Sequence, residues 1–157
     1  MLEVFTTPNG RVSVPVLGQG WALEEQSSTL ATRVSARLVV PGQFALFVAE
    51  DHYAEVRCDA EGWARARLEE YSGRYEAVTC RSLEPVEVGG VRWLEASLEI
   101  IVHSRLAPLN KLERIAAVGG HRLTLSTEAS AKDLRKYWLE AQRWLEETRF
   151  GAGRKEN

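Results

Sequence analysis

The segment from Val91 to His103 constrains the fold most, because its side chains alternate between two faces with the period of a β-strand. One face holds only apolar residues, at positions 94, 96, 98, 100 and 102. The opposite face is mixed and therefore at least partly wet, with Trp93, Glu95, Ser97, Glu99 and His103. Gly89-Gly90 directly precedes the segment and is a two-residue hairpin signal. A long strand that follows a hairpin and has one apolar face predicts an antiparallel sheet.

The same alternation recurs along the chain. Leu112–Val118 and His121–Thr127 flank a second Gly-Gly pair, so a two-residue turn is expected to join them. Arg33–Val40 alternates cleanly and is followed by Pro41-Gly42, which predicts a tight turn into a strand beginning at Phe44. Further strands are expected at Val12–Val16, Trp21–Gln26, Glu76–Glu84 and Val86–Val88.

Two segments have a helical period instead. After Asp59, a reasonable N-cap, apolar residues recur at helical spacing, at Ala60, Ala64, Leu68, Tyr71 and Tyr75. This first helix should end between Tyr71 and Tyr75, because Gly73 weakens its last turn.

The second helix should begin at a capping-box-like Ser130-x-x-Asp133. Its apolar arc comprises Leu134, Tyr137, Trp138, Ala141, Trp144, Leu145 and Thr148. Trp138 is central in that arc, whereas Tyr137 and Trp144 share one edge of it. Gly151 is a natural C′ residue, and residues 151–157 are expected to form a flexible tail.

These elements predict an α+β fold, with a single antiparallel sheet of about six or seven strands and two helices packed over it. The chain has 157 residues, the length of one ordinary domain, so residues 1–150 are assigned to one domain. Such a chain needs neither a metal nor a disulfide to fold, and no metal or cofactor is expected.

Charge and hydropathy restrict the function. The net charge is −2, which argues against a nucleic-acid partner held by bulk charge. No apolar run is long enough for a transmembrane helix, so no direct membrane insertion is expected. The first residues contain no signal-peptide pattern, which predicts a cytoplasmic location.

The densest set of chemically active residues lies between Glu50 and Asp59, with His52, Glu55 and Cys58 among them. Their spacing matches no zinc or calcium motif, so a polar connection before a helix is the favoured interpretation. A small enzyme that uses this region is the less favoured alternative. Cys58 and Cys80 form no CxxC pair, and no nucleophile motif surrounds either of them. We therefore expect no catalytic residues and no enzyme activity.

Three aromatic residues are the candidate partner-binding residues. Trp63 lies off the apolar stripe of its helix, beside Arg67 and Glu70 on the helical wheel. Tyr137 and Trp144 lie at a stripe edge where they are expected to be part-exposed. Tryptophan is enriched at binding hot spots, although a position at the edge of the core is the more ordinary interpretation of Trp63.

Several local patterns together resemble a known fold group. They are Gly20-Trp21, Leu68-Glu-Glu-Tyr71, Leu83-Glu-Pro-Val86 leading through Gly-Gly into the long strand, Val118-Gly-Gly-His121, and a terminal helix with Trp138 and Trp144 that ends at Thr148-Arg149-Phe150. With these patterns the stretch from Trp63 to Phe150 resembles the PsbP-like group, which includes a fungal Ran-release factor, the DcrB proteins and the Eag-type chaperones of type VI secretion. Residues 22–55 match the group poorly. The DcrB and PsbP relatives carry export signals and this sequence shows none, which favours comparison with the cytosolic members, among which the Eag-type chaperones resemble it in size.

The resemblance implies protein binding rather than catalysis. The predicted function is a non-enzymatic protein-binding module, an adaptor or chaperone that holds an apolar segment of a secreted or membrane-inserted partner. A small-ligand-binding domain with a pocket between sheet and helix is the alternative, and the sequence is also compatible with a homodimer. Fold analogy does not decide between them.

Overall fold

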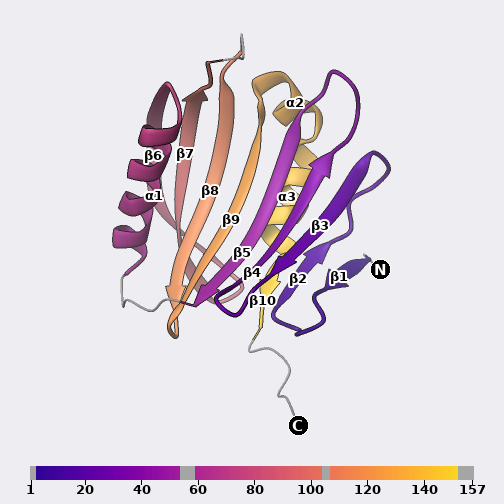
Figure 1. The fold of residues 1–157 in the computed structure, drawn as a ribbon, viewed down its shortest axis with the longest axis vertical. Coiled ribbons are helices and arrows are strands. Elements are labelled where there is room, and N and C mark those ends of the chain that lie inside the picture. The colour runs from indigo at the N-terminus through magenta and orange to yellow at the C-terminus, as the bar shows by residue number, and fades with distance from the viewer. Residues whose placement is uncertain (1–2, 54–58, 104–106, 152–157) are drawn as a thin grey trace.

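The computed structural model describes residues 3–53, 59–103 and 107–151 of the protein (Figure 1). Within them the elements are β1 Val4–Thr6, β2 Val12–Pro15, β3 Trp21–Ser27, β4 Ala31–Leu38, β5 Ala45–Tyr53, α1 Ala60–Arg74, β6 Ala77–Val88, β7 Val91–Ile101, β8 Leu109–Val118, β9 His121–Ser130, α2 Ala131–Lys136, α3 Trp138–Glu147 and β10 Arg149–Phe150. The predicted α+β class with a large antiparallel sheet under helices is confirmed.

Seven strands form the large sheet in the order β3-β4-β5-β9-β8-β7-β6, and every neighbouring pair is antiparallel. Both predicted Gly-Gly hairpins are present. In the second of them, Gly119 and Gly120 have φ values of 57° and 84°, and the flanking Val118 and His121 pair across the turn. Such a turn needs positive φ at both central residues, which glycine adopts without strain. The cysteine-bearing strand β6 has a register shift between Cys80 and Ser82.

A second, three-stranded sheet is an addition to the predicted single sheet. It has the order β1-β2-β10, and its last strand pairs Arg149 with Ser13 and Phe150 with Val12. Thr148–Phe150 was expected to form the end of the terminal helix. The helix ends at Glu147 because the chain turns extended at Thr148, with φ −66° and ψ 133°, and then pairs with β2.

The terminal helix is divided in two at Tyr137, whereas one continuous helix was expected. Tyr137 has φ −106° and ψ 26°, outside helical geometry. Two side-chain contacts hold this point against the segment before β5. The Tyr137 hydroxyl donates to Gln43 Oε1, and the Phe44 backbone N–H donates to Asp133 Oδ2 at 2.9 Å. The predicted cap at Ser130 is confirmed, since its hydroxyl oxygen accepts from the Asp133 N–H.

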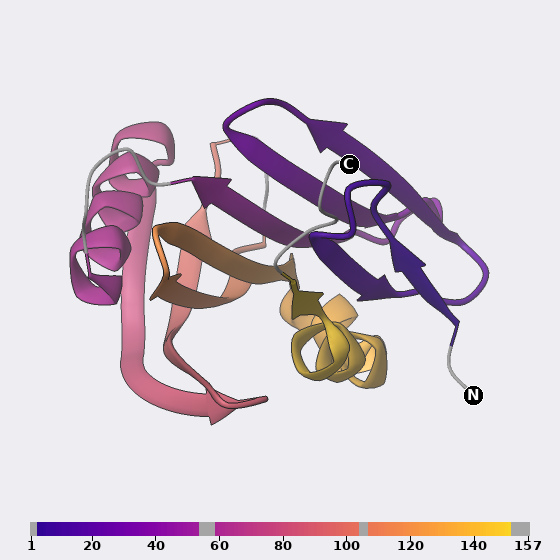
Figure 2. The same cartoon turned by 90° about the horizontal axis from the view of Figure 1, so that it is seen from below.

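Helix α1 lies on one side of the large sheet and helices α2 and α3 lie on the other, as Figure 2 shows from below. On one face, α1 packs over β7 and β8, where Tyr71 joins a cluster with Leu98 and Ile100. On the opposite face, α2, α3 and the small sheet cover β4, β5 and β9. Strand β9 separates the two layers, because Leu125 points into the second core while Ser126 lies on the α1 side.

The burial of the two tryptophans of α3 differs from what the sequence predicted. Trp144 was expected at a stripe edge, part-exposed, but it is 0% exposed and lies in the core beside Phe47. Trp138 was expected at the centre of the stripe, yet it is 42% exposed. Both expectations were wrong. On a helical wheel Trp138 and Trp144 lie at opposite edges of the apolar arc, and strand β2 and Phe47 cover the edge that holds Trp144.

Candidate binding site around helix α1

Helix α1 has a cleft on each of its two sides. On the side of β5 and β9 lies a polar pocket of about 290 Å³. On the side of β6 and β7 lies an apolar groove of about 860 Å³. The helix packs mainly on β8, and the sheet extends past it on both sides, which leaves room for both clefts.

Glu113 of β8 is the centre of a buried polar network under α1, and its side chain is only 1% exposed. Its carboxylate accepts hydrogen bonds from Arg67 Nε and from the Tyr71 hydroxyl, the latter at 2.6 Å. Tyr71 bonds to Glu113 Oε2, and the Ser126 hydroxyl lies 3.5 Å and Lys111 Nζ 3.7 Å from that oxygen. Burying a carboxylate costs several kcal/mol unless it is paired, so this set of partners compensates for the position of Glu113.

The network also changes the acidity of its members. Burial, together with the negative charge of Glu113, raises the pKa of the Tyr71 hydroxyl above its ordinary value. Burial alone would lower the pKa of the Arg67 guanidinium, but the Glu113 charge and then Tyr71 raise it. Arg67 therefore remains a cation and Tyr71 a hydrogen-bond donor throughout the physiological range.

Trp63 lies on the polar side of α1. Its indole N–H donates to Thr124 Oγ1 at 3.2 Å. The Arg122 guanidinium carbon lies 4.2 Å from the centre of the Trp63 ring, and that of Arg67 lies 5.5 Å from it. Cations this close to an indole face are attracted to its negative quadrupole. The ring is half-buried and its polar contacts are made within the molecule.

Glu50 and His52 of β5 extend this polar surface. His52 Nε2 and Glu50 Oε1 form a hydrogen bond, and the His52 ring lies 6.4 Å from that of Trp63. Burial alone would raise the pKa of Glu50, but the hydrogen bond and charge of His52, with the charges of Arg67 and Arg33, lower it overall. Glu50 is therefore ionised near neutral pH.

The polar pocket is enclosed by residues from α1 and from strands β4, β5, β8 and β9. They are Arg33, Leu46, Val48, Glu50, Arg67, Glu70, Tyr71, Arg74, Tyr75, Lys111, Ser126 and Glu128.

The apolar groove has a different chemistry. Its walls and floor are formed by Ala60, Ala64, Leu68, Leu83, Pro85, Trp93, Leu94 and Ala117, with Asp59, Glu61, Arg65 and Arg92 also lining it. The small side chains of Ala60 and Ala64 on α1 leave space opposite Leu83 and Pro85 of β6. Leu83 is 44% exposed, which is high for a leucine that faces a helix.

The three residues predicted to bind a partner do not form one site. Trp63 is on α1 and faces the polar pocket side. Tyr137 packs edge-on against Trp21 at 5.9 Å on the opposite face of the sheet. Trp144 is enclosed in the core and presents no surface to a partner. Of the three, Trp63 alone borders the candidate site.

The residues between Glu50 and Asp59 are also separated in space. Glu50 and His52 share the α1 face of the sheet, whereas Asp51 is on the other face and accepts from Arg11 Nε at 3.2 Å and pairs with His121 Nδ1 at 2.7 Å. That group links β5 to the segment before β2. Glu55 and Cys58 lie outside the described residues.

Asp59 caps α1 by accepting from the Gly62 N–H at 2.7 Å. Among the residues that the structure describes, no three His, Cys, Asp or Glu side chains are placed to share a metal ion. Cys80 is exposed on β6.

The central residues of the candidate site were not predicted from the sequence. They are Arg67, Lys111, Glu113 and Glu128. One signal was available. Lys111 and Glu113 alternate on the same face of β8 as Ile115, and Thr124, Ser126 and Glu128 alternate likewise on β9. Two adjacent strands with a polar face beneath a helix indicate a polar helix–sheet interface.

An α+β domain with one large antiparallel sheet and helices on both of its faces is the class that these observations define. The chain has the PsbP-like fold, as its sequence predicted. The solution structure of cyanobacterial PsbP (CyanoP) from Synechocystis sp. PCC 6803 matches with a TM-score of 0.65 and 9% identity, covering 96% of this chain and 92% of that one.

Two further solved structures share this fold. A Pseudomonas aeruginosa protein of unknown function matches with a TM-score of 0.55 and 10% identity, covering 90% of this chain and 94% of that one. LpqN, involved in cell envelope biogenesis of Mycobacterium tuberculosis, matches with a TM-score of 0.52 and 12% identity, covering 94% and 89%. No family model and no curated protein matches the sequence. At such identities the likeness shows the fold, and function has to be inferred from the sites.

No helix in the described part of the chain is both long and apolar enough to cross a membrane.

Proposed function

We propose that this protein is a non-enzymatic protein-binding module, an adaptor or chaperone that holds an apolar segment of a partner in the groove between α1 and β6–β7. The observation that supports the proposal is the groove itself. Its lining is predominantly aliphatic, and Leu83 in its wall is 44% exposed. When a partner covers the partly exposed apolar side chains that line an open groove, the complex is stabilised by roughly 25 cal/mol per Å² of apolar surface removed from water.

The edge strand β6 indicates how a partner segment would bind. An edge strand accepts another strand through its free backbone groups, and proteins block this with proline, bulges and charges. Strand β6 contains Pro85, a register shift between Cys80 and Ser82, and the charged Arg81 and Glu84. We therefore propose that the partner binds through side chains that enter the groove and not by adding a strand to the sheet.

The chemistry of the groove also favours binding over catalysis. The lining residues that the structure describes include no cysteine, histidine, serine or threonine. Of the two carboxylates among them, Asp59 is engaged as the cap of α1, where it accepts from the Gly62 N–H. The resemblance of its local sequence patterns to the Eag-type chaperones of type VI secretion supports a secreted or membrane-inserted protein as the partner.

A direct test uses a fluorescent synthetic peptide of alternating leucine and alanine with lysines at both ends, titrated with the protein in an anisotropy assay. Leu83→Glu introduces a carboxylate into the groove wall and should weaken binding at least about tenfold, equivalent to 1.4 kcal/mol. The control is Leu139→Glu, which changes a 73% exposed leucine on α3, away from the groove. It should bind as the wild type does.

Circular dichroism spectra of both variants should match that of the wild type, as the control for folding. A peptide in which serines replace the leucines should not bind. If the wild type fails to bind the apolar peptide, or if Leu83→Glu and Leu139→Glu bind it equally well, the groove is not the binding site.

A further inference from the structure

The polar pocket on the other side of α1 combines both signs of charge. Four cations line it, from Arg33, Arg67, Arg74 and Lys111, and three carboxylates, from Glu50, Glu70 and Glu128. The Glu113 carboxylate lies behind the lining and is bonded to two of these side chains, Arg67 and Lys111, through an ion pair each. The pocket is therefore close to neutral as a whole.

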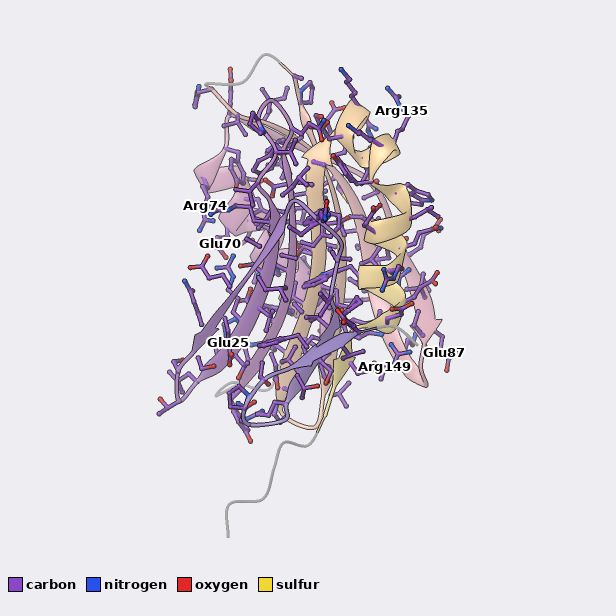
Figure 3. The ribbon with its side chains drawn as sticks, turned by 90° about the vertical axis from the view of Figure 1, so that its right-hand side faces the viewer. Glu25, Glu70, Arg74, Glu87, Arg135 and Arg149 are labelled. Carbon is purple, nitrogen blue, oxygen red and sulfur yellow. The ribbon has the colours of Figure 1, made fainter. Side chains whose placement is uncertain are left out.

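Most of these charges are already paired with one another. Arg74 Nη2 lies 2.8 Å from Glu70 Oε1, and Figure 3 shows the two side chains together on α1. Lys111 Nζ lies 3.3 Å from Glu128 Oε2. A ligand with a net charge would meet a repelling group beside each attracting one, so the pocket offers little Coulombic stabilisation to an ion.

A hydroxyl group suits this arrangement better. Arginine and lysine only donate hydrogen bonds, ionised carboxylates only accept them, and a hydroxyl does both. Two neighbouring hydroxyls on one ligand can therefore span an existing ion pair, accepting from the cation and donating to the carboxylate. Leu46, Val48 and Tyr75 provide an apolar wall for the C–H groups of such a ligand.

Arg33 of β4 provides a donor that the protein itself does not use. In the described part of the chain its guanidinium makes no hydrogen bond or ion pair, although its charge contributes to lowering the pKa of Glu50. Its side chain is exposed at the pocket, on the strand that pairs with β5. A donor in this position is free to bind a ligand without breaking an internal contact.

We infer that this pocket binds a neutral polyhydroxylated small molecule and that Arg33 is a residue that determines its affinity. The volume of about 290 Å³ lies at the lower end of small-molecule pockets, which limits the ligand to roughly the size of one sugar ring. This site is separate from the groove and does not depend on the proposed function.

The test is an amide chemical-shift titration with D-glucose, D-galactose and myo-inositol, with glucose 6-phosphate and D-glucosamine as charged comparators. At least one neutral compound should produce saturable shifts at Val48 and Ser126, and the charged compounds should bind more weakly. The inference is overturned if no neutral compound gives a saturable shift up to ~50 mM, a concentration that detects millimolar affinity, or if a charged compound binds best.

Two variants on one strand provide a matched comparison. Arg33→Ala should weaken binding of the best neutral compound about tenfold, the effect of losing a charged hydrogen-bond donor. Arg37→Ala changes another exposed arginine on the same face of β4 that does not line the pocket, and it should leave the affinity unchanged. Leu83→Glu changes a residue of β6 in the apolar groove and should also leave the affinity for the neutral compound unchanged. Equal weakening by Arg33→Ala and Arg37→Ala would refute the role of Arg33.

Discussion

The ion pair between Arg67 and Glu113 allows a quantitative test of what holds α1 on the sheet. The two side chains are 12% and 1% exposed, and the Tyr71 hydroxyl bonds to both of them. Removing one partner of a buried pair leaves the other charge uncompensated, which typically costs about 3–5 kcal/mol. Glu113→Leu should therefore destabilise the protein by about that amount. For a domain of this size the loss corresponds to a decrease in Tm of roughly 6–20 °C.

The double variant Arg67→Leu/Glu113→Leu distinguishes a charge effect from general damage. It removes both ions and replaces them with apolar side chains, a change that is often neutral or stabilising relative to the buried pair. Tyr71 then loses its partners, so a residual cost of about 1–3 kcal/mol is expected. In urea melts of the wild type, both single variants and the double variant, the double should be more stable than Glu113→Leu alone. Stability losses that add within about 0.5 kcal/mol would show that the pair is not energetically coupled, which would contradict our interpretation.

Three further predictions follow from burial, acidity and backbone geometry. Trp144→Ala should cost about 3–5 kcal/mol in a denaturant melt, because the Trp144 side chain is 0% exposed. Leu139→Ala changes a 73% exposed leucine on the same helix and should alter stability by under about 0.5 kcal/mol, so similar losses for the two variants would contradict the assigned core. Burial and a neighbouring carboxylate raise the pKa of Tyr71 above 10.0, so the contribution of Tyr71 to stability is complete below about pH 10 and is lost as the pH rises above it. Tyr71→Phe should therefore flatten the alkaline decrease in the free energy of unfolding, and an unchanged slope would refute this. Gly20→Ala should cost about 1–3 kcal/mol, because the φ of Gly20 is +88° and the new Cβ would lie 2.9 Å from a methyl carbon of Val40. A Cβ at Gly18 meets open space, so Gly18→Ala should be close to neutral in thermal melts.

Much of the large sheet was predictable because its signals are local. The alternation in Arg33–Val40 and Val91–His103 and the two Gly-Gly turns depend only on neighbouring residues, and strands with these faces and turns are present in the structure. The caps at Asp59 and Ser130 are local in the same sense. The second sheet was not predictable in this way. Its strand Arg149–Phe150 is only two residues long and pairs with residues near the start of the chain.

The site was less predictable because its contacts are distant in the sequence. Arg67 and Glu113 are separated by 46 residues, and neither is unusual within its own element. The error on the tryptophans has a different cause. Trp138 and Trp144 lie at opposite edges of the apolar arc, and the edge that is buried is the one covered by strand β2, which is distant in the sequence. Local periodicity therefore located the elements correctly but assigned Trp138 and Trp144 to the wrong environments.

The pairing of β5 with β9 has a consequence for how the chain folds. Strands β3, β4 and β5 form one meander and β6, β7, β8 and β9 form another, and each is built from contacts between consecutive strands. The seam between them aligns Ala45 with Ala129 and Tyr53 with His121, across all the residues of α1 and three strands. Closing so long a loop costs chain entropy before any contact compensates for it. We expect the two meanders to form early and their junction at β5 and β9 to set the folding rate.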